Sequence, residues 1–390
     1  MDKETIRKLD QEYIVHTYAR SELFVESGKG ARVKDVEGNE YIDLTSGIGV
    51  ASLGFCNDAW VEAVKAQLDK IQHISNLYYT QPAPLLAEKL CKKTGMKKVF
   101  FANSGAEANE CAIKSSRKYG SSIDEKKTDV VSLIDSFHGR TLQTLTATGQ
   151  DDMHKYFGPF PDGFKYVPAN DAEAMAAAVD GNTCAVIMEL IQGEGGVNVL
   201  DKDFVQAVRK ICDENGALLI IDEVQTGIGR TGKFFCYEHY GIEPDLVTFA
   251  KGIGGGLPLG GVLFSEKTQD ILQPGDHGTT FGANPVICAG ALSVVDQMTD
   301  ELMDEAIKKG DHMREKLSSI EGVKDVSGIG LMMGFNIDGM EPGDVAAKAL
   351  EKGVIALTAH GKVRLLPPLV IEWDDIDKAL EVIAEVAAEK

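Results

Sequence analysis

Three short segments carry side chains that could do chemistry together. Lys251 ends an apolar run in "TFAKGIGGG", Asp222 ends another in "LLIIDEVQ", and Ser104 follows a third in "FFANSGAEANE". A lysine can bond covalently to an aldehyde. A carboxylate buried at a strand end needs a cationic partner, such as a protonated ring nitrogen. A loop that enters a helix, as at Ser104, can bind a phosphate through its N–H groups.

A nucleotide site is the first alternative for these segments. In a P-loop the glycines precede the lysine, and a serine or threonine follows it directly. Here Gly252 follows Lys251, and the other glycines come after it. Asp222 and Glu223 could instead bind Mg²⁺ at the carboxyl edge of a parallel sheet, but no phosphate loop accompanies them. A Mg²⁺-dependent nucleotide enzyme therefore explains "IDEV" but not the order of the glycines.

Together the three segments supply the anchors that a pyridoxal phosphate enzyme needs. The aldehyde of this coenzyme bonds to a lysine, its ring must stay protonated to draw electrons, and its phosphate must be held. Lys251, Asp222 and the loop at Ser104 could meet these needs in turn. Simple capping of the helix by Ser104 remains the alternative explanation for the third anchor.

The elements that must position these residues follow from six short apolar runs. They cover residues 98–102, 130–134, 184–190, 217–222, 246–250 and 260–265. Continuous apolar runs are typical of strands buried on both faces of a mostly parallel sheet. Amphipathic stretches predict helices from about Glu107 to Tyr119 and from Asp203 to Asn215, with Gly216 ending the second. This alternation predicts an α/β domain.

The pattern changes after Pro285. A long helical stretch is expected over about 286–318, followed by short strands in "GLMMGFNI", "VIALTA" and "KVRLLP". Asp374 is the expected N-cap of a last helix. Helices grouped with a few strands, without regular alternation, predict a smaller α+β domain. A chain of 390 residues is long enough for two domains.

Composition argues against several classes of protein. The net charge of -20 disfavours general binding to nucleic acid or to anionic membranes. The seven cysteines form no CxxC pair and the eight histidines show no metal-ligand spacing, so we expect no metal site and no disulfide framework. The start "MDKETIRKLDQEY" lacks the apolar core of a signal peptide, and no apolar run approaches the ~20 residues that span a bilayer. These features predict a cytoplasmic protein.

Six motifs together resemble those of one family. They are "SGAEANE", "SFHGRT", "ELIQGEGG", "IDEVQTGIGRTG", "TFAKGIGGGLPLGG" and "GTTFGANP", in this order. They are similar to the motifs of the class III aminotransferases of fold type I, and the resemblance covers the chain from Phe24 to its C-terminus. It implies a large domain with a mostly parallel seven-stranded sheet over 46–284, and a small α+β domain formed by 1–45 and 285–390.

The resemblance also implies how the coenzyme, pyridoxal 5'-phosphate, is held. Lys251 matches the lysine that bonds to it, and Asp222 matches the partner of its ring nitrogen. Gln225 matches the residue near its phenolic oxygen. Phe137 matches the aromatic that stacks on the ring, although core packing is the alternative for a phenylalanine taken alone. The remaining positions that would bind the coenzyme are Ser104, Gly105, Ala106, His138, Glu189 and Val224.

Two arginines match positions that bind substrates. Arg140 corresponds to the residue that binds a carboxylate of the amino donor, a task that suits the bidentate guanidinium. Arg364 corresponds to the residue for the α-carboxylate of 2-oxoglutarate or glutamate. Glu194 corresponds to the glutamate that pairs with this arginine when an ω-amino donor is bound. An ordinary surface ion pair is the alternative for Arg364.

Two neighbouring threonines complete the set implied by the resemblance. Thr279 matches a position that contacts the substrate. Thr280 matches the threonine that reaches the coenzyme phosphate of the other subunit. The resemblance therefore implies a homodimer whose active sites are shared across the interface.

The reaction implied is transfer of the δ-amino group of N2-acetyl-L-ornithine to 2-oxoglutarate, by a ping-pong mechanism that gives N-acetyl-L-glutamate 5-semialdehyde and L-glutamate. Within the class, "SGIGVASLG" and "NLYYTQP" are most similar to the acetylornithine aminotransferases. Ornithine, 4-aminobutyrate and succinylornithine aminotransferases share nearly every motif and remain alternatives. An aminomutase or racemase would keep Lys251 and Asp222 but could lack the pair of Arg364 and Glu194. A binding protein that has lost catalysis is a further alternative, against which the presence of Lys251 argues.

Overall fold

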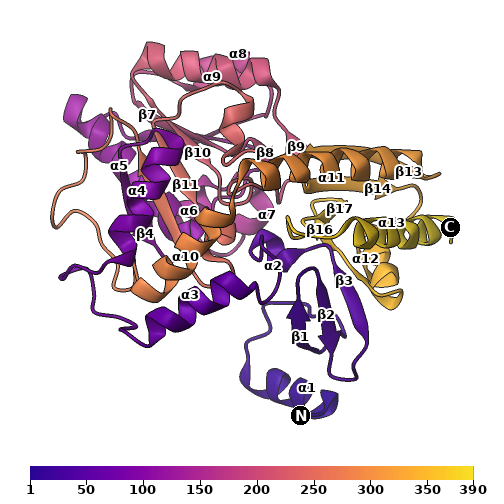
Figure 1. Cartoon of the computed structure of the whole chain (residues 1–390). Helices are drawn as coiled ribbons and strands as arrows, with labels where there is room; N and C mark the ends of the chain where they lie inside the picture. The colour runs from indigo at the N-terminus through magenta and orange to yellow at the C-terminus, as the bar shows by residue number, and fades with distance from the viewer. Residues whose placement is uncertain (390) are drawn as a thin grey trace.

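A seven-stranded sheet forms the centre of the computed structural model, which describes residues 1–389 (Figure 1). Its strands, in spatial order, are β4 (Lys98–Ala102), β12 (Gly260–Phe264), β11 (Leu246–Phe249), β10 (Leu218–Asp222), β7 (Thr183–Met188), β5 (Asp129–Leu133) and β6 (Phe164–Val167). Only β12 runs antiparallel to its neighbours, and the other pairings are parallel. The predicted α/β fold with a mostly parallel seven-stranded sheet is therefore confirmed.

The strands lie where the continuous apolar runs predict them, to within about two residues. Every residue of β7 and β10 is buried, which explains why these segments read as unbroken apolar stretches. The apolar runs do not predict β6. Its sequence "FKYV" lies at the edge of the sheet and is only partly buried, so it needs fewer apolar residues.

Helices flank the central sheet (Figure 1). They are α3 (Asp58–Leu68), α4 (Pro82–Thr94), α5 (Gly105–Ile123), α6 (Leu142–Ala147), α7 (Asp151–His154), α8 (Ala172–Ala178), α9 (Lys202–Asn215) and α10 (Pro285–Gln297). Helix α5 begins directly after Ser104, whose hydroxyl accepts the Glu107 N–H at 3.2 Å. Helix α9 ends at Gly216, which takes the left-handed conformation with φ of 60° as predicted.

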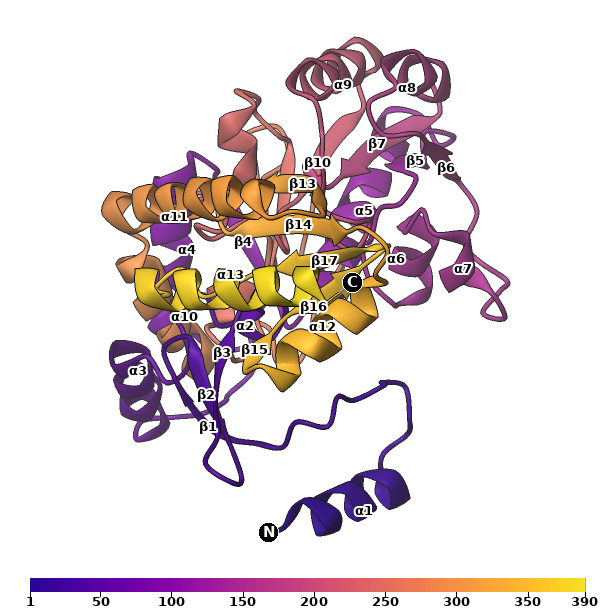
Figure 2. The same ribbon diagram turned by 90° about the vertical axis from the view of Figure 1, so that its right-hand side faces the viewer.

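The single long helix expected over 286–318 is divided in two. Helix α10 ends at Gln297, and Thr299 then caps α11 (Asp300–Ser319) through its hydroxyl, which accepts the Leu302 N–H. Helix α10 packs against α3 and α4 beside the central sheet. Helix α11 instead packs on a second sheet and on the C-terminal helix α13 (Trp373–Ala388), as Figure 2 shows. The break lets the chain pass from one sheet to the other.

The second sheet and a third one are small. The second contains β13 (Val323–Ile329), β14 (Met332–Ile337), β17 (Lys362–Leu365) and β16 (Leu357–Ala359), and the third contains β1 (Val25–Lys29), β2 (Arg32–Asp35), β3 (Glu40–Asp43) and β15 (Val354–Ile355). The run "VIALTA" therefore supplies strands to two sheets. A further pair joins β8 (Ile191–Gln192) to β9 (Asn198–Val199), and α12 (Pro342–Glu351) packs on α13.

One predicted cap is wrong. Helix α13 begins at Trp373 with Glu372 at the N-cap, so Asp374 lies inside the first turn. A carboxylate in the first turn is favourable beside the free N–H groups, and this makes the two positions hard to tell apart by sequence.

The two ends of the chain lie differently in the molecule. Helix α13 packs against α11 and α12, whereas α1 (Lys3–Tyr13) has no buried residue and extends away from the rest (Figure 2). The domain division at residues 45/46 and 284/285 stays a prediction. No helix within residues 1–389 is long and apolar enough to cross a membrane.

Candidate active site

A pocket opens at the edge of the central sheet where its parallel strands end. Strands β4, β5, β7, β10 and β11 are all followed there by side chains that line the pocket. The lining residues are Val50, Asn103 to Ala106, Asn109, Phe137 to Arg140, Glu189, Asp222, Val224, Gln225, Ala250, Lys251 and Gly256 to Leu259. Ten of the residues expected to bind the coenzyme are thus brought together with Arg140.

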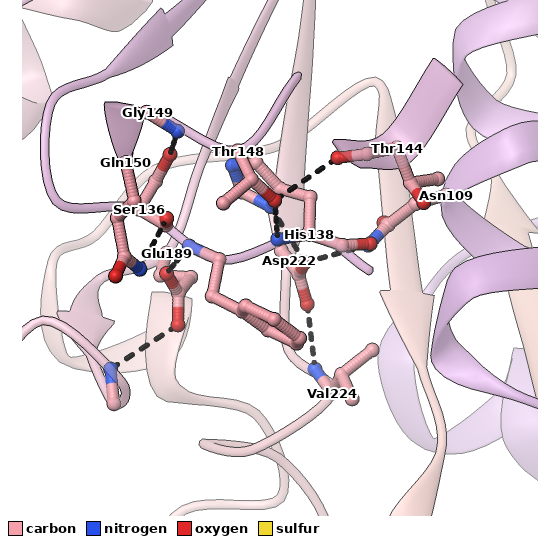
Figure 3. A network of polar contacts seen from close by, with 12 residues as sticks. Asn109, Ser136, His138, Thr144, Thr148, Gly149, Gln150, Glu189, Asp222 and Val224 are labelled. Carbon is pink, nitrogen blue, oxygen red and sulfur yellow. Dashed lines mark hydrogen bonds and ion pairs between the residues drawn. The ribbon is translucent and has the colours of Figure 1, made fainter. Parts of the chain in front are cut away.

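Asp222 is the centre of a hydrogen-bond network in this pocket (Figure 3). Its Oδ2 accepts the Asn109 Nδ2–H₂ group at 2.8 Å and lies 2.8 Å from His138 Nδ1. Its Oδ1 accepts the Val224 N–H at 3.0 Å. A carboxylate offers about four acceptor positions, so one position on Oδ1 is left for a further donor. The side chain is 3% exposed.

Glu189 lies next to this network. Its Oε1 accepts the Phe137 N–H at 2.8 Å, and its Oε2 accepts the Gly193 N–H at 3.2 Å. Burial raises the pKa of Glu189 to about 7, and the nearby Asp222 adds to the rise while His138 opposes it. A carboxyl group with such a pKa can hold or release a proton near neutral pH.

Lys251 follows β11 and has a strained backbone. Its φ is 50°, in the left-handed region that non-glycine residues rarely adopt, at a cost of about 1–3 kcal/mol. Burial lowers the pKa of its amine, although the charge of Glu194 works in the opposite direction. A lowered pKa makes the neutral, nucleophilic amine more accessible.

The loop before α5 presents the N-terminus of a long helix to the pocket. Glu107 Oε2 accepts both the backbone N–H and the side-chain amide of Asn103, each at 2.7 Å. The N–H groups of Gly105 and Ala106 have no acceptor within the helix and remain available for an anion. A Cβ on Gly105 would lie 2.8 Å from Val224 Cγ1, so this position requires glycine.

Arg364 lies on β17 and approaches the pocket from the second sheet. Its Nη1 donates to Glu194 Oε1 at 2.7 Å and to Gln225 Oε1 at 3.0 Å. The residue is 2% exposed, so the alternative of a surface ion pair does not hold. The expected pair of Arg364 and Glu194 is therefore formed, and Gln225, which lines the pocket, connects the pair to it.

The remaining expected residues lie at the open side. The Arg140 guanidinium is exposed, 5.6 Å from the centre of the Phe137 ring. Thr279 Oγ1 accepts the Asn103 amide at 2.8 Å. Thr280 is exposed and does not belong to the pocket lining.

Sequence reasoning overlooked Asn103 and Asn109. The Asn109 amide donates to both Asp222 and the carbonyl of His138, each at 2.8 Å. The signal was present in "SGAEANE": an asparagine, which favours caps and turns, lies one turn inside a helix on the face that carries buried alanines. A buried asparagine in such a position is expected to form hydrogen bonds with its side chain.

Comparison with known proteins identifies the family. The model of the family described as aminotransferase class III matches residues 13–387. The chain belongs to the class III aminotransferases. A relative from Haemophilus ducreyi, named acetylornithine aminotransferase, is 48% identical to this aminotransferase over 392 residues. The match covers 100% of both chains.

Solved structures agree with this family. The ornithine aminotransferase of Toxoplasma gondii, in a structure with partial occupancy of PLP at its active site, is 31% identical with a TM-score of 0.95, covering 100% of this aminotransferase and 94% of that chain. The acetylornithine aminotransferase of Elizabethkingia anophelis is 31% identical with a TM-score of 0.90, and the match covers 100% of both chains.

The residues of the pocket fit pyridoxal 5'-phosphate. Asp222 has an acceptor position left, the N-terminus of α5 offers N–H donors, and Lys251 provides an amine. Two buried atoms, His138 Nε2 and Asn109 Oδ1, have no hydrogen-bond partner among the described residues, as expected for a site made to hold a polar group. No group of three or more His, Cys, Asp or Glu residues in the described chain could hold a metal ion.

Proposed function

We propose that this aminotransferase moves the δ-amino group of N2-acetyl-L-ornithine to 2-oxoglutarate, giving N-acetyl-L-glutamate 5-semialdehyde and L-glutamate. Pyridoxal 5'-phosphate is the coenzyme. The observation that carries the substrate is the full-length identity of 41–48% to curated relatives that are named acetylornithine aminotransferase. The observation that carries the chemistry is the placement of Lys251 and Asp222 on one pocket.

The coenzyme, when bound, supplies an aldehyde that bonds to an amine and a protonated ring that draws electrons from the neighbouring carbon. Lys251 Nζ holds the coenzyme between turnovers and moves a proton from the carbon that bears the amine. Asp222 stabilises the proton on the ring nitrogen through its remaining acceptor position. Val224, Asn109 and His138 keep the Asp222 carboxylate in place.

The other proposed contacts hold the rest of the coenzyme. Ser104, Gly105 and Ala106 bind the phosphate at the N-terminus of α5, and Phe137 packs on the ring. Gln225 reaches the phenolic oxygen. Glu189 is proposed to act through the Phe137 backbone, because its carboxylate accepts that N–H.

Substrates are proposed to use the two arginines separately. Arg140 binds a carboxylate of the amino donor, and Arg364 binds the α-carboxylate of 2-oxoglutarate or glutamate. Glu194 pairs with Arg364 while the ω-amino donor occupies the site and releases it for the dicarboxylate. Thr279 is a further substrate contact. Ping-pong kinetics follow because the two substrates occupy the same site in turn, so the first product leaves before 2-oxoglutarate binds.

The proposed assembly is a cytoplasmic homodimer. Thr280 of the partner subunit reaches the coenzyme phosphate, which accounts for its exposure in one subunit. The domain division at 45/46 and 284/285 belongs to this proposal, since it places Arg364 and Lys251 in different domains.

Two measurements test the proposal. The purified protein should absorb visible light through its lysine-bound coenzyme, and Lys251→Ala should change that spectrum and abolish amine transfer. An unchanged spectrum would overturn the role of Lys251. For the substrate, kcat/KM is compared among N-acetylornithine, ornithine, 4-aminobutyrate and N-succinylornithine with 2-oxoglutarate as acceptor. A large preference for one of the last three would replace acetylornithine as the donor.

A further inference from the structure

The second half of the motif "IDEVQTGIGRTG" has no part in the function proposed above. Its Arg230 is the largest fully buried side chain among residues 1–389, with 1% exposed. Arg230 Nη1 donates to the carbonyl of Leu331 at 3.0 Å and to the carbonyl of Pro367, and its Nη2 donates to Ser46 Oγ at 3.3 Å. These three acceptors are neutral, and burial lowers the pKa of Arg230 to about 10, although the charge of the nearby buried Asp43 works in the opposite direction. Keeping a cation in this place is costly, which points to a role in fixing geometry.

The acceptors of Arg230 belong to segments that meet at one end of β17. Leu331 lies in the turn between β13 and β14, and Pro367 comes two residues after β17. The Ser46 hydroxyl, which accepts from Arg230, donates in turn to the carbonyl of Leu366 at 2.7 Å. The Leu366 N–H donates to the carbonyl of Leu44 at 2.7 Å. The backbone directly after β17 in the sequence is thus held by hydrogen bonds at Leu366 and Pro367.

The same loop also holds the other end of this segment. Gln225, five residues before Arg230, accepts a hydrogen bond from the Arg364 guanidinium at 3.0 Å. Arg364 lies three residues before Pro367. The loop from Gln225 to Arg230 therefore contacts both the side chain of Arg364 and the backbone that carries it.

The loop between these contacts has little freedom to move. Ile228 is buried and has a φ of 58°, a strained value for a β-branched residue. At Gly229 a Cβ would lie 3.0 Å from Leu369 Cδ1, and at Gly232, two residues after Arg230, one would lie 2.1 Å from Ile307 Cγ1. Both glycines also have positive φ values, of 82° and 81°. Close packing therefore fixes the loop against α11 and the segment after β17.

We propose that Arg230 is a positioning residue for the substrate arginine, Arg364. Its guanidinium donates hydrogen bonds to three segments of the chain at once, which a shorter side chain or one with a single donor could not do. By fixing the end of β17 relative to Gln225, it sets the place at which Arg364 meets a dicarboxylate. This inference rests on the proposed role of Arg364.

The test measures binding of glutarate, a dicarboxylate without a reactive keto group, by calorimetry on the coenzyme-loaded enzyme. Arg230→Met should weaken glutarate binding roughly 10- to 100-fold, the range expected when a charge-assisted hydrogen bond to the ligand is weakened or lost. The visible absorbance per subunit should stay unchanged. In the double variant with Arg364→Ala, glutarate should bind no more weakly than in Arg364→Ala alone, because Arg230 acts through Arg364.

A matched control separates positioning from simple loss of stability. Arg209→Met on α9 removes a largely buried arginine from its ion pair with Asp245, and it should lower the melting temperature without changing glutarate affinity. Should Arg230→Met prove unable to fold, Ser46→Ala removes the hydroxyl between Arg230 and Leu366 and should weaken glutarate binding to a smaller extent. Unchanged glutarate affinity in a folded variant, or a full additive loss in the double variant, would overturn the proposal. Glutarate binding that survives Arg364→Ala would instead contradict the proposed role of Arg364.

Discussion

At the scale of single residues, Glu223 shows how a buried acid can serve a neighbour. It follows Asp222 directly and is fully buried. Its Oε2 accepts the Thr226 hydroxyl at 2.6 Å, and its Oε1 accepts the Tyr237 N–H at 2.8 Å. These bonds hold the two ends of the loop that contains Arg230. Burial is nevertheless the largest influence and raises the pKa of Glu223 to about 7.

The raised pKa predicts a pH-dependent stability. In the unfolded chain the group ionises near its ordinary pKa of 4.5, so the folded state binds more protons between that value and about 7. The stability that Glu223 contributes is therefore full below about pH 4.5 and is lost as the pH rises through about 7. In Glu223→Gln the side-chain oxygen can still accept the Tyr237 N–H, and the side-chain amide can donate to the Thr226 hydroxyl. The glutamine cannot ionise. We expect it to unfold like the wild type at pH 5 and to be more stable at pH 8, by up to about 3 kcal/mol.

Thermal unfolding at equal protein concentration, measured from pH 5 to pH 8, checks this expectation. Glu214→Gln on the exposed end of α9 is the control and should leave the pH profile unchanged. A stability difference between Glu223→Gln and the wild type that does not vary with pH would contradict it.

Residues with direct chemical tasks could be predicted from the sequence, whereas their supports could not. Lys251 and Asp222 are recognisable because each ends an apolar strand at the sheet edge where ligands bind. Asn109 and Arg230 act through contacts with segments that are distant in sequence, at separations of 113 and 137 residues. Only the folded chain brings those partners together.

At the scale of elements, the turn after Lys251 depends on close packing. It is a 3-10 helix, η2 (Lys251–Gly254), followed by Gly255 with a φ of 60°. A Cβ on Gly255 would lie 2.6 Å from Trp60 Nε1, and the same nitrogen donates to the carbonyl of Gly254 at 3.2 Å. The glycines therefore let α3 approach the backbone that carries Lys251.

Two adjacent substitutions separate this packing from a general effect of alanine. Gly255→Ala should destabilise the protein by about 2 kcal/mol, through its positive φ and the contact with Trp60. It should also lower kcat, because the turn carries Lys251. Gly254→Ala meets only ordinary contacts at 3.6 Å and should be close to neutral. Melting temperature and kcat are measured for both, and equal losses in the two variants would contradict the packing argument.

The elements themselves were predictable to different extents. Buried parallel strands read as unbroken apolar runs and lie where expected, but the edge strand β6 and the half-exposed β13 do not show this pattern. The break between α10 and α11 falls at Met298 and Thr299, where no glycine or proline interrupts the helical pattern. Tertiary packing decides it, since the two helices cover different sheets.

At the scale of the whole molecule, exposed apolar side chains lie near Thr280, the residue proposed to reach the partner's site. Phe281 is 59% exposed. Leu77 and Tyr79 are also exposed, and they closely follow Asn76 in the sequence. The Asn76 amide donates to the carbonyl of Gly282, the residue after Phe281, at 2.8 Å. Large exposed apolar side chains in one region mark interaction surfaces. The same loop carries Thr279, which is tied to Asn103 beside the phosphate loop.

Mixed dimers test whether active sites are shared. One chain carries Lys251→Ala and the other carries Thr280→Asp, whose carboxylate would repel the coenzyme phosphate. If Thr280 serves the partner's site, one site of the mixed dimer has both defects and the other has neither, so the mixed dimer should recover about half of the wild-type activity. If Thr280 serves its own chain, each site keeps one defect. Activity after separation of the mixed dimer by affinity tags distinguishes the two arrangements, because recovery above the level of the Thr280→Asp homodimer requires a site built from both chains.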